Sequence, residues 1–195
     1  MKTLILIVTT LCLASGTLLS PEVERRVLDH HNKLRRGEGS SDMKEMKWDP
    51  TLAQTASMWA DGCVFKHGHP TSVKTNYGYV GQNIFWSSSE SVDAVDGIQK
   101  FFDEKKDYIY SQTKCRERAV CGHYTQVVWA DSEYVGCAAT VCSGKREEGK
   151  VSGTLMVCNY GPGGNYRGAK PFKVGRACSE CETGYRCRND LCYKP

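Results

Sequence analysis

The first half of the chain carries apolar side chains at the three- and four-residue spacing of a helix. The first such segment begins at Ser20, a typical N-cap residue, continues with Pro21, which suits the first helical position, and ends at Gly37. Its inward positions repeat with a helical period, and they are Val23, Val27, His30 and Leu34. This segment is therefore predicted to be an amphipathic helix.

Two more amphipathic helices are predicted before the pattern changes. One follows Asp49, and its inward face carries Leu52, Ala56, Trp59 and Cys63. The other begins near Ser91, and its inward face carries Val95, Ile98, Phe102 and Ile109. This third helix is also expected to hold Glu104, on a neighbouring face with Phe101 and Tyr108.

The second half of the chain alternates apolar and polar residues, which is typical of strands. Residues 120–130 are predicted to form a strand with four side chains on one face, namely His123, Thr125, Val127 and Trp129. Residues 134–142 and 154–160 are predicted to form two more strands, joined by the polar loop 143–152. The Gly-Pro-Gly-Gly run at 161–164 ends the regular structure. Helices come first and strands follow, which indicates the α+β class.

The N-terminus has the order of a secretory signal. Met1 and Lys2 form a short basic lead, residues 3–13 are an apolar run, and residues 14–16 are small. The run is too short to span a bilayer as a helix, and its lack of a polar face disfavours the alternative of a buried N-terminal helix. Residues 1–16 are therefore predicted to be a cleaved signal peptide. We expect the protein to be secreted and extracellular, with no transmembrane anchor.

The cysteine content agrees with secretion. The chain has 11 cysteines, and Cys12 would leave with the signal peptide, so that an even number remains. An even, dense set in an oxidising compartment indicates a framework of disulfides. The alternative is metal binding, because the last four cysteines are spaced loosely like a zinc ribbon, at Cys178, Cys181, Cys187 and Cys192. The predicted compartment favours disulfides.

The charge pattern argues against nucleic acid as a partner. The formal net charge is only +4 at pH 7, and basic residues are interspersed with acidic ones. Nucleic-acid-binding proteins usually concentrate Lys and Arg on one face or along one helix. No such stripe is visible in the sequence.

Two signatures in the second half resemble those of the CAP superfamily, which includes the cysteine-rich secretory proteins, the venom allergen-like proteins and the plant pathogenesis-related proteins. The first runs from Gly122 to Trp129 (GHYTQVVW), and the second from Val157 to Asn165 (VCNYGPGGN). Three shorter motifs fall in family order, namely His31-Asn32-x-x-Arg35, Met46-x-Trp48-Asp49 and Gly81-Gln82-Asn83. The resemblance covers residues 22–168, most of the chain.

The resemblance implies an α-β-α sandwich, in which helices flank a central antiparallel sheet. It divides the chain into the signal peptide at 1–16, a CAP domain at 17–172 and a cysteine-rich tail at 173–195 that resembles the hinge of the cysteine-rich secretory proteins. The tail has too few apolar residues to fold without its bridges. Cutting the chain after Lys173 is expected to leave the sandwich folded, with a melting temperature within a few degrees of the parent.

The resemblance also implies a site. In CAP proteins two His and two Glu converge in a large cleft, where some members bind a divalent metal. By motif, three of these positions are His67, Glu104 and His123, and the second family Glu falls on Gln82 in this chain. This departure removes one of two carboxylates. Without the family, each His would more often be structural than a ligand, and Glu104, followed by two lysines, would suit a solvated ion-pair helix.

Two neutral imidazoles and one carboxylate form a reasonable zinc set with water as the fourth ligand. His67, Glu104 and His123 are therefore candidate metal ligands, and we expect zinc to bind weakly, with no cofactor required. Glu104 could instead orient His123. Metal-activated water is the one hydrolytic mechanism with support, because no Gly-x-Ser-x-Gly motif is present and the cysteines are expected to be oxidised.

The favoured function is a binding or effector protein that acts outside the cell, with no catalytic residue assigned. The family implies a lipid or sterol, an extracellular or cell-surface protein, or an ion channel as the partner. The alternative is a metal-dependent, protease-like hydrolase that uses the His/Glu cleft. A metal-water hydrolase usually keeps a strong acidic base, which disfavours this alternative.

Five disulfides are predicted. The hairpin around 143–152 places Cys137 opposite Cys158, whereas Cys137 and Cys142 on one strand would be roughly 16 Å apart, too far to join. The family implies a bridge from Cys63 to Cys142. The remaining pairs close local loops, and they are Cys115–Cys121, Cys178–Cys187 and Cys181–Cys192.

Overall fold

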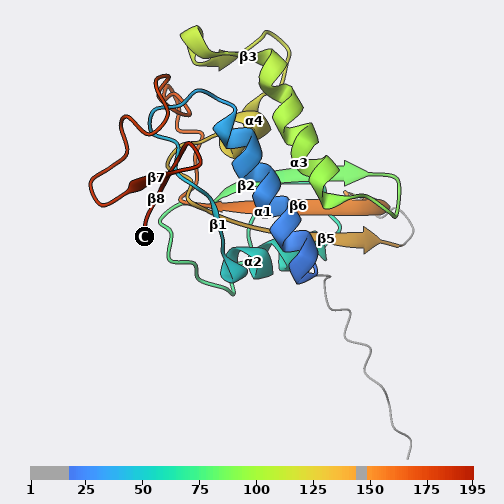
Figure 1. Ribbon diagram of the computed structural model, residues 1–195. Coiled ribbons are helices and arrows are strands. Elements are labelled where there is room, and N and C mark those ends of the chain that lie inside the picture. The colour runs from blue at the N-terminus through green and yellow to red at the C-terminus, as the bar shows by residue number, and fades with distance from the viewer. Residues whose placement is uncertain (1–17, 144–148) are drawn as a thin grey trace, which may run out of the picture.

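The computed structural model describes residues 18–143 and 149–195 (Figure 1). The predicted signal peptide and Cys12 lie outside these residues. A four-stranded sheet forms the centre, with the strand order β1-β5-β6-β2. The strands are β1 (Lys47–Trp48), β2 (Gly81–Ser87), β5 (Tyr134–Cys142) and β6 (Gly153–Gly161). Within the described residues, no helix is both long and apolar enough to cross a bilayer.

The sheet is mixed, which corrects the expected antiparallel one. Strands β5 and β6 form the predicted antiparallel hairpin, and β2 is the antiparallel neighbour of β6 on its other side. Strand β1 pairs with β5 in parallel, however, through Lys47 opposite Tyr134 and Trp48 opposite Val135. The β1 segment is only two residues long and leads into a helix, so that its pattern gives no sign of a strand or of its direction.

Helices cover both faces of the sheet. Helix α2 (Pro50–Ala60) packs on one face, and α1 (Pro21–Arg36), α3 (Ala94–Asp103) and α4 (Gly122–Val127) cover the other (Figure 1). Alternate residues of β6 enter the two cores, with Met156 and Cys158 on the α1 side and Leu155 and Val157 on the α2 side. All nine residues of β6 are buried. The α-β-α sandwich therefore forms around this strand.

The predicted caps explain where the first helices begin. The Ser20 hydroxyl accepts a hydrogen bond from the Val23 backbone N–H at the start of α1, and Gly37 ends the helix. The Asp49 carboxylate caps α2 in the same way. Of the predicted inward positions in α1, Val27 is fully buried, whereas His30 is half-buried and its neighbour His31 is fully buried.

The predicted strand at 120–130 is wrong, because its first part is the six-residue helix α4. Four consecutive residues of α4 are buried, from Tyr124 to Val127, so burial on all sides hides the helical period. The buried guanidinium of Arg35 fixes the end of this segment by donating to the carbonyls of Val127, Trp129 and Ala130. Burial lowers the pKa of Arg35 to about 9.

The third helix is shorter than predicted. It begins after the N-cap Asp93 and ends at Asp103, so that Glu104 lies in the following turn η1 (Glu104–Asp107) and Ile109 in the strand β3 (Tyr108–Ile109). Strand β3 pairs with β4 (Lys114–Cys115), and the short turn η2 (Tyr110–Gln112) lies between them. Strand β2 was not predicted, because five of its seven residues are apolar or buried without a clean alternation.

The structure joins the cysteines in five disulfides, and they are the five predicted pairs: Cys63–Cys142, Cys115–Cys121, Cys137–Cys158, Cys178–Cys187 and Cys181–Cys192. Three tail sulfurs lie within 4.8 Å of one another. Each is bonded to another sulfur, and a bonded sulfur is not the thiolate that zinc requires.

The tail packs on the sandwich instead of standing apart. Its two strands are β7 (Arg186–Arg188) and β8 (Leu191–Tyr193). The Cys192 backbone donates to the Met43 carbonyl at 2.8 Å and accepts from the Glu45 N–H at 2.9 Å. The Leu191 side chain is fully buried in the core on the α1 side of the sheet. The tail therefore contributes a core residue, which its sequence alone does not reveal.

Candidate functional site

Four predicted residues meet where four parts of the fold come together, and we call them the histidine site: His67, Gln82, Glu104 and His123. His67 lies in the loop after α2, Gln82 on β2, Glu104 at the start of the turn η1 that follows α3, and His123 in the first turn of α4. The ring centroids of His67 and His123 are 6.3 Å apart. The structure thus brings together residues that are up to 56 positions apart in the chain.

Glu104 orients His123 with both of its carboxylate oxygens. Its Oε1 atom accepts a hydrogen bond from Nδ1 of His123 at 2.7 Å. Its Oε2 atom accepts from the backbone N–H groups of His123, at 2.9 Å, and Tyr124, at 3.3 Å. In the neutral ring Nδ1 carries the proton that Glu104 accepts, and the Nε2 atom of His123 then has its lone pair available.

Gln82 uses every hydrogen-bonding position of its amide. Its Oε1 atom accepts from the His67 ring at 3.3 Å and from the Gly68 N–H at 3.1 Å. Its Nε2 atom donates to the Gly68 carbonyl at 2.7 Å and to Oδ1 of Asn159 at 3.1 Å. The amide therefore clamps the loop that carries His67 to the sheet.

His67 is exposed, and its contact with Gln82 sets its tautomer. Since Oε1 of Gln82 can only accept, Nδ1 of His67 donates, and its Nε2 atom also keeps a lone pair. Burial lowers the pKa of His69, a hydrogen bond with the Val80 backbone opposes this shift, and the proximity of His67 adds a smaller lowering. His69 is thus part of the surroundings of the site.

A buried hydrogen-bond network holds the backbone of His123 in place, and the sequence did not predict it. The Asn83 side chain donates to the His123 carbonyl at 3.0 Å and to the Tyr160 hydroxyl at 3.3 Å. The Tyr160 hydroxyl in turn lies 3.1 Å from Nε2 of His31, whose Nδ1 bonds the Val27 carbonyl. The network's members Asn83, His31 and Tyr160 each lie in one of the family motifs, but the motifs gave no sign that they are bonded to one another. Burial lowers the pKa of His31 to about 3, so His31 is neutral.

The histidine site fits a divalent metal only loosely. Two imidazoles bound to one zinc at about 2.1 Å in tetrahedral geometry would have centroids roughly 5 Å apart. The observed 6.3 Å therefore requires a closure of about an ångström. Among the residues that the structure describes, only tail sulfurs form a group of three such ligand atoms within 4.8 Å. The donors suit zinc, but the site is not preassembled as a three-ligand centre.

Comparison with known proteins places these observations in a family. The model of the cysteine-rich secretory protein family (CAP) matches residues 28–160. Glioma pathogenesis-related protein 1 of Mus musculus is 40% identical over 169 residues, which cover 85% of this chain and 62% of that protein. Peptidase inhibitor 16 of Mus musculus is 35% identical over 178 residues, which cover 90% of this chain but 34% of that protein. The chain thus spans about a third to three fifths of these relatives.

Solved structures give the same result for the fold. The crystal structure of Na-ASP-1 matches with a TM-score of 0.75 and 25% identity, over 98% of this chain and 52% of that one. The crystal structure of NaASP2 with Zn2+ matches with a TM-score of 0.68 and 28% identity, over 93% of this chain and 99% of that one. From its signatures, its sandwich and these relatives, the chain belongs to the CAP family of cysteine-rich secretory proteins.

Proposed function

We propose that this CAP protein is secreted and acts outside the cell as a binding protein, with a histidine site that takes a divalent cation reversibly. The family, the five disulfides and the secretory pattern at the N-terminus support secretion. The disulfide-bridged scaffold would present its loops to a partner, and binding needs no catalytic residue.

The observation that carries this proposal is the use of the polar groups in the histidine site. Glu104 is its one carboxylate, and three hydrogen bonds to α4 occupy both oxygens. Gln82 stands where the family has a second carboxylate, and all its amide positions are engaged. Two imidazole lone pairs remain, but none of the four residues has a carboxylate free to act as a general base.

The roles of the residues follow from these contacts. His67 and His123 would hold the cation through their Nε2 atoms, Glu104 would keep His123 in the correct tautomer, and Gln82 would hold the loop of His67 in place. A bound zinc ion would supply a Lewis acid that polarises a coordinated oxygen. Without a free base beside it, such an ion serves better as a link to a partner or as a structural clamp.

Calorimetric titration with zinc chloride tests this proposal. We expect weak binding to the secreted protein at pH 7.5, loss of binding in His123→Ala, and weaker binding at pH 5.5 because protonated imidazoles do not coordinate. His30→Ala is the matched control, since His30 contacts Gln99 instead of the site. Casein and an activated ester test the alternative, because zinc-dependent turnover that His123→Ala abolishes would support a hydrolase. Equal zinc affinity in all variants would overturn the metal assignment.

A further inference from the structure

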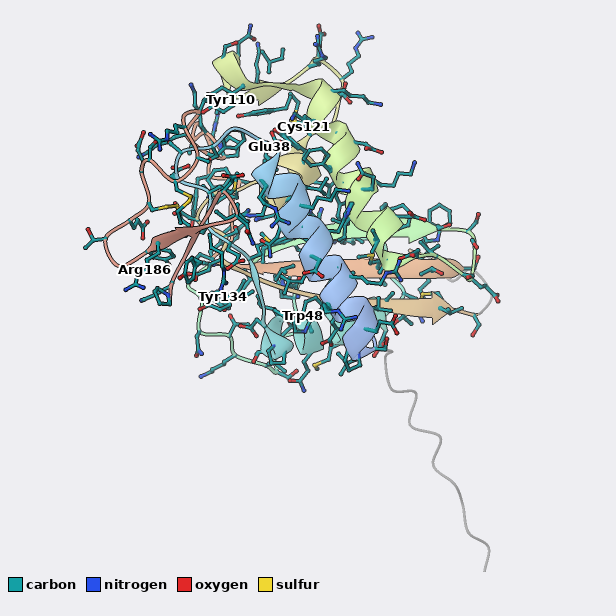
Figure 2. The ribbon with its side chains drawn as sticks, in the orientation of Figure 1. Glu38, Trp48, Tyr110, Cys121, Tyr134 and Arg186 are labelled. Carbon is teal, nitrogen blue, oxygen red and sulfur yellow. A yellow bond between two sulfur atoms is a disulfide. The ribbon has the colours of Figure 1, made fainter. Side chains whose placement is uncertain are left out.

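Two hollows share part of their lining in the loop 165–170. The larger has a volume of about 900 Å³ and lies between the sandwich and the tail. The smaller, of about 300 Å³, lies beside the β3–β4 pair. Trp129, Tyr166 and Ala169 line both of them. Figure 2 labels Tyr110 of the larger hollow and Cys121 of the smaller, and both lie at the same end of the molecule.

The walls of the larger hollow are aromatic. The ring centroids of Tyr110 and Phe172 are 5.3 Å apart, and the Tyr110 hydroxyl donates a hydrogen bond to the Phe172 carbonyl at 2.6 Å. The Tyr166 ring contacts the rings of both Trp129 and Tyr79, with centroid distances of 5.9 Å in each case. Tyr79 and Tyr166 are nevertheless 52% and 55% exposed. Clustered and exposed aromatic rings are typical of an interface more than of an ordinary face of a protein.

The two hollows differ in charge: the larger is lined by as many carboxylates as lysines, with Asp42, Asp131 and Glu182 beside Lys44, Lys170 and Lys173, whereas the smaller has only cations. The smaller hollow is lined by Lys114 and Arg167 and by no carboxylate. In the larger hollow, Lys170 lies 4.5 Å from the centre of the Tyr110 ring. Within the described part of the chain, Lys114, Arg167 and Lys170 form no ion pair with a carboxylate.

Other lysines of the larger hollow are already neutralised. Lys44 binds Asp131 at 2.9 Å and Glu182 at 2.8 Å, and Lys173 binds Glu180 at 2.7 Å. The cations left for a ligand are therefore Lys114, Arg167 and Lys170, and the last two belong to the loop 165–170. A ligand that bridges both hollows would meet aromatic rings first and unpaired cations beside them.

We propose that this surface binds an acidic segment of an extracellular protein. An apolar side chain of that segment would enter the aromatic hollow, and its carboxylates would lie against Lys114, Arg167 and Lys170. The inference deepens the proposed binding function and does not use the histidine site. Burial of an aromatic or aliphatic anchor supplies affinity, and the charges supply orientation and a fast association rate.

The shape and charge favour a polypeptide over a sulfated glycan. A hollow of about 900 Å³ with four aromatic walls has room for apolar side chains. A polyanion that ran through it would also meet Asp131 and Glu182, whose side chains are 66% and 60% exposed. Only a ligand with few, well-placed carboxylates avoids this repulsion.

Selection from a random 12-residue peptide library on the immobilised secreted protein tests the proposal. We expect enriched peptides in which Asp or Glu flank an aromatic or aliphatic residue. Their affinity should fall by about tenfold or more in the double variant Arg167→Glu/Lys170→Glu, and with rising salt. The double variant Arg25→Glu/Lys33→Glu makes the same change of charge on the exposed face of α1, and should bind as the parent does. Tyr166→Ala tests the aromatic part without a change of charge.

Several results would overturn the proposal. They are no enrichment, enrichment without acidic residues, or an equal loss of affinity in the α1 control. A heparin fragment that binds the parent but not Arg167→Glu/Lys170→Glu, without acidic peptides being enriched, would assign the surface to a glycan instead. Zinc titration of the same double variant keeps the two proposals apart, since unchanged zinc affinity leaves the histidine site untouched.

Discussion

The β5–β6 hairpin and the histidine site are held by different kinds of contact. The hairpin is buried between two apolar cores and bridged by Cys137–Cys158, so that its position depends on many contacts at once. The histidine site takes its residues from a loop and the ends of elements, and individual hydrogen bonds at Gln82 and Glu104 fix it. The hairpin should therefore be sensitive to changes in side-chain volume. The histidine site should be sensitive to changes of single atoms or of pH.

The largest effect is expected where α2 approaches the hairpin. A Cβ atom on Gly136 would lie 2.1 Å from the Ala53 backbone nitrogen and 2.6 Å from the Asp49 carbonyl oxygen. Backbone atoms cannot move aside as a side chain can, so Gly136→Ala should cost more than about 3 kcal/mol of unfolding free energy, or prevent folding. Urea unfolding measures this loss.

Gly78→Ala is the matched control for that change. A Cβ atom there meets nothing within 4 Å, and no unusual backbone angle requires glycine. Its unfolding free energy should stay close to that of the parent, or rise slightly. Equal stability of the Gly136 and Gly78 variants would show that α2 is not packed tightly on the hairpin.

The tail is expected to give the next largest effect. Leu191 is fully buried in the core, so Leu191→Ala should cost about 2–4 kcal/mol, which corresponds to several degrees or more in melting temperature. Removal of the whole tail after Lys173 should cost at least as much, which exceeds the few degrees predicted from the sequence. Calorimetry measures both. Val174→Ala, at a side chain that is 64% exposed, is the control. A melting temperature unchanged by Leu191→Ala would restore the view of an independent tail.

The buried network under the site predicts a dependence on pH. Burial lowers the pKa of His31 to about 3 in the folded chain, whereas an unfolded chain restores it to about 6.5. Unfolding therefore takes up a proton between these values, so His31 contributes stability fully above pH 6.5 and loses it as pH falls toward 3. The slope is at most about 1.4 kcal/mol per pH unit.

His31→Gln should reduce that slope, although it also lowers stability at neutral pH. Unfolding free energies at pH 7, 5.5 and 4 measure the difference between the variant and the parent. His30→Gln, at the half-buried neighbour that contacts Gln99, should keep the slope. If the unfolding free energies of both variants depend on pH as that of the parent does, carboxylates alone cause the acid sensitivity.

What the sequence could predict follows the same division. The sequence predicted β5 and β6 as two strands joined by a polar loop, and the position of that loop placed Cys137 opposite Cys158, because a hairpin loop sets the register of the strands it joins. The same reasoning failed for α4, whose four consecutive buried residues have no period, and for β1, which has only two residues. Family motifs gave the four residues of the histidine site. They could not show the clamp at Gln82 or the support from Asn83, because hydrogen-bond partners depend on tertiary position.

The smallest effect is expected at Gln82, and it separates the two kinds of order most sharply. Gln82→Glu restores the family residue, but it replaces a donor by an oxygen that faces the Gly68 carbonyl at 2.7 Å and Oδ1 of Asn159 at 3.1 Å. Asn159 cannot easily turn its amide around, because its nitrogen already donates to the Thr55 hydroxyl at 2.9 Å. Two attractions therefore become repulsions, which should cost about 1–3 kcal/mol at pH 7.5.

The pH dependence of that cost distinguishes a clamp from a simple loss of packing. Repulsion from two acceptors raises the pKa of the new carboxyl above its unfolded value of about 4.3, and its protonated form can donate as the amide did. The difference in melting temperature between Gln82→Glu and the parent should therefore be small at pH 4 and grow as pH rises to 7.5. Gln54→Glu, at an exposed position of α2, should show no such growth. A cost that is equal at both pH values would mean that Gln82 fills space without clamping the loop of His67, and that the orientation of this histidine has another cause.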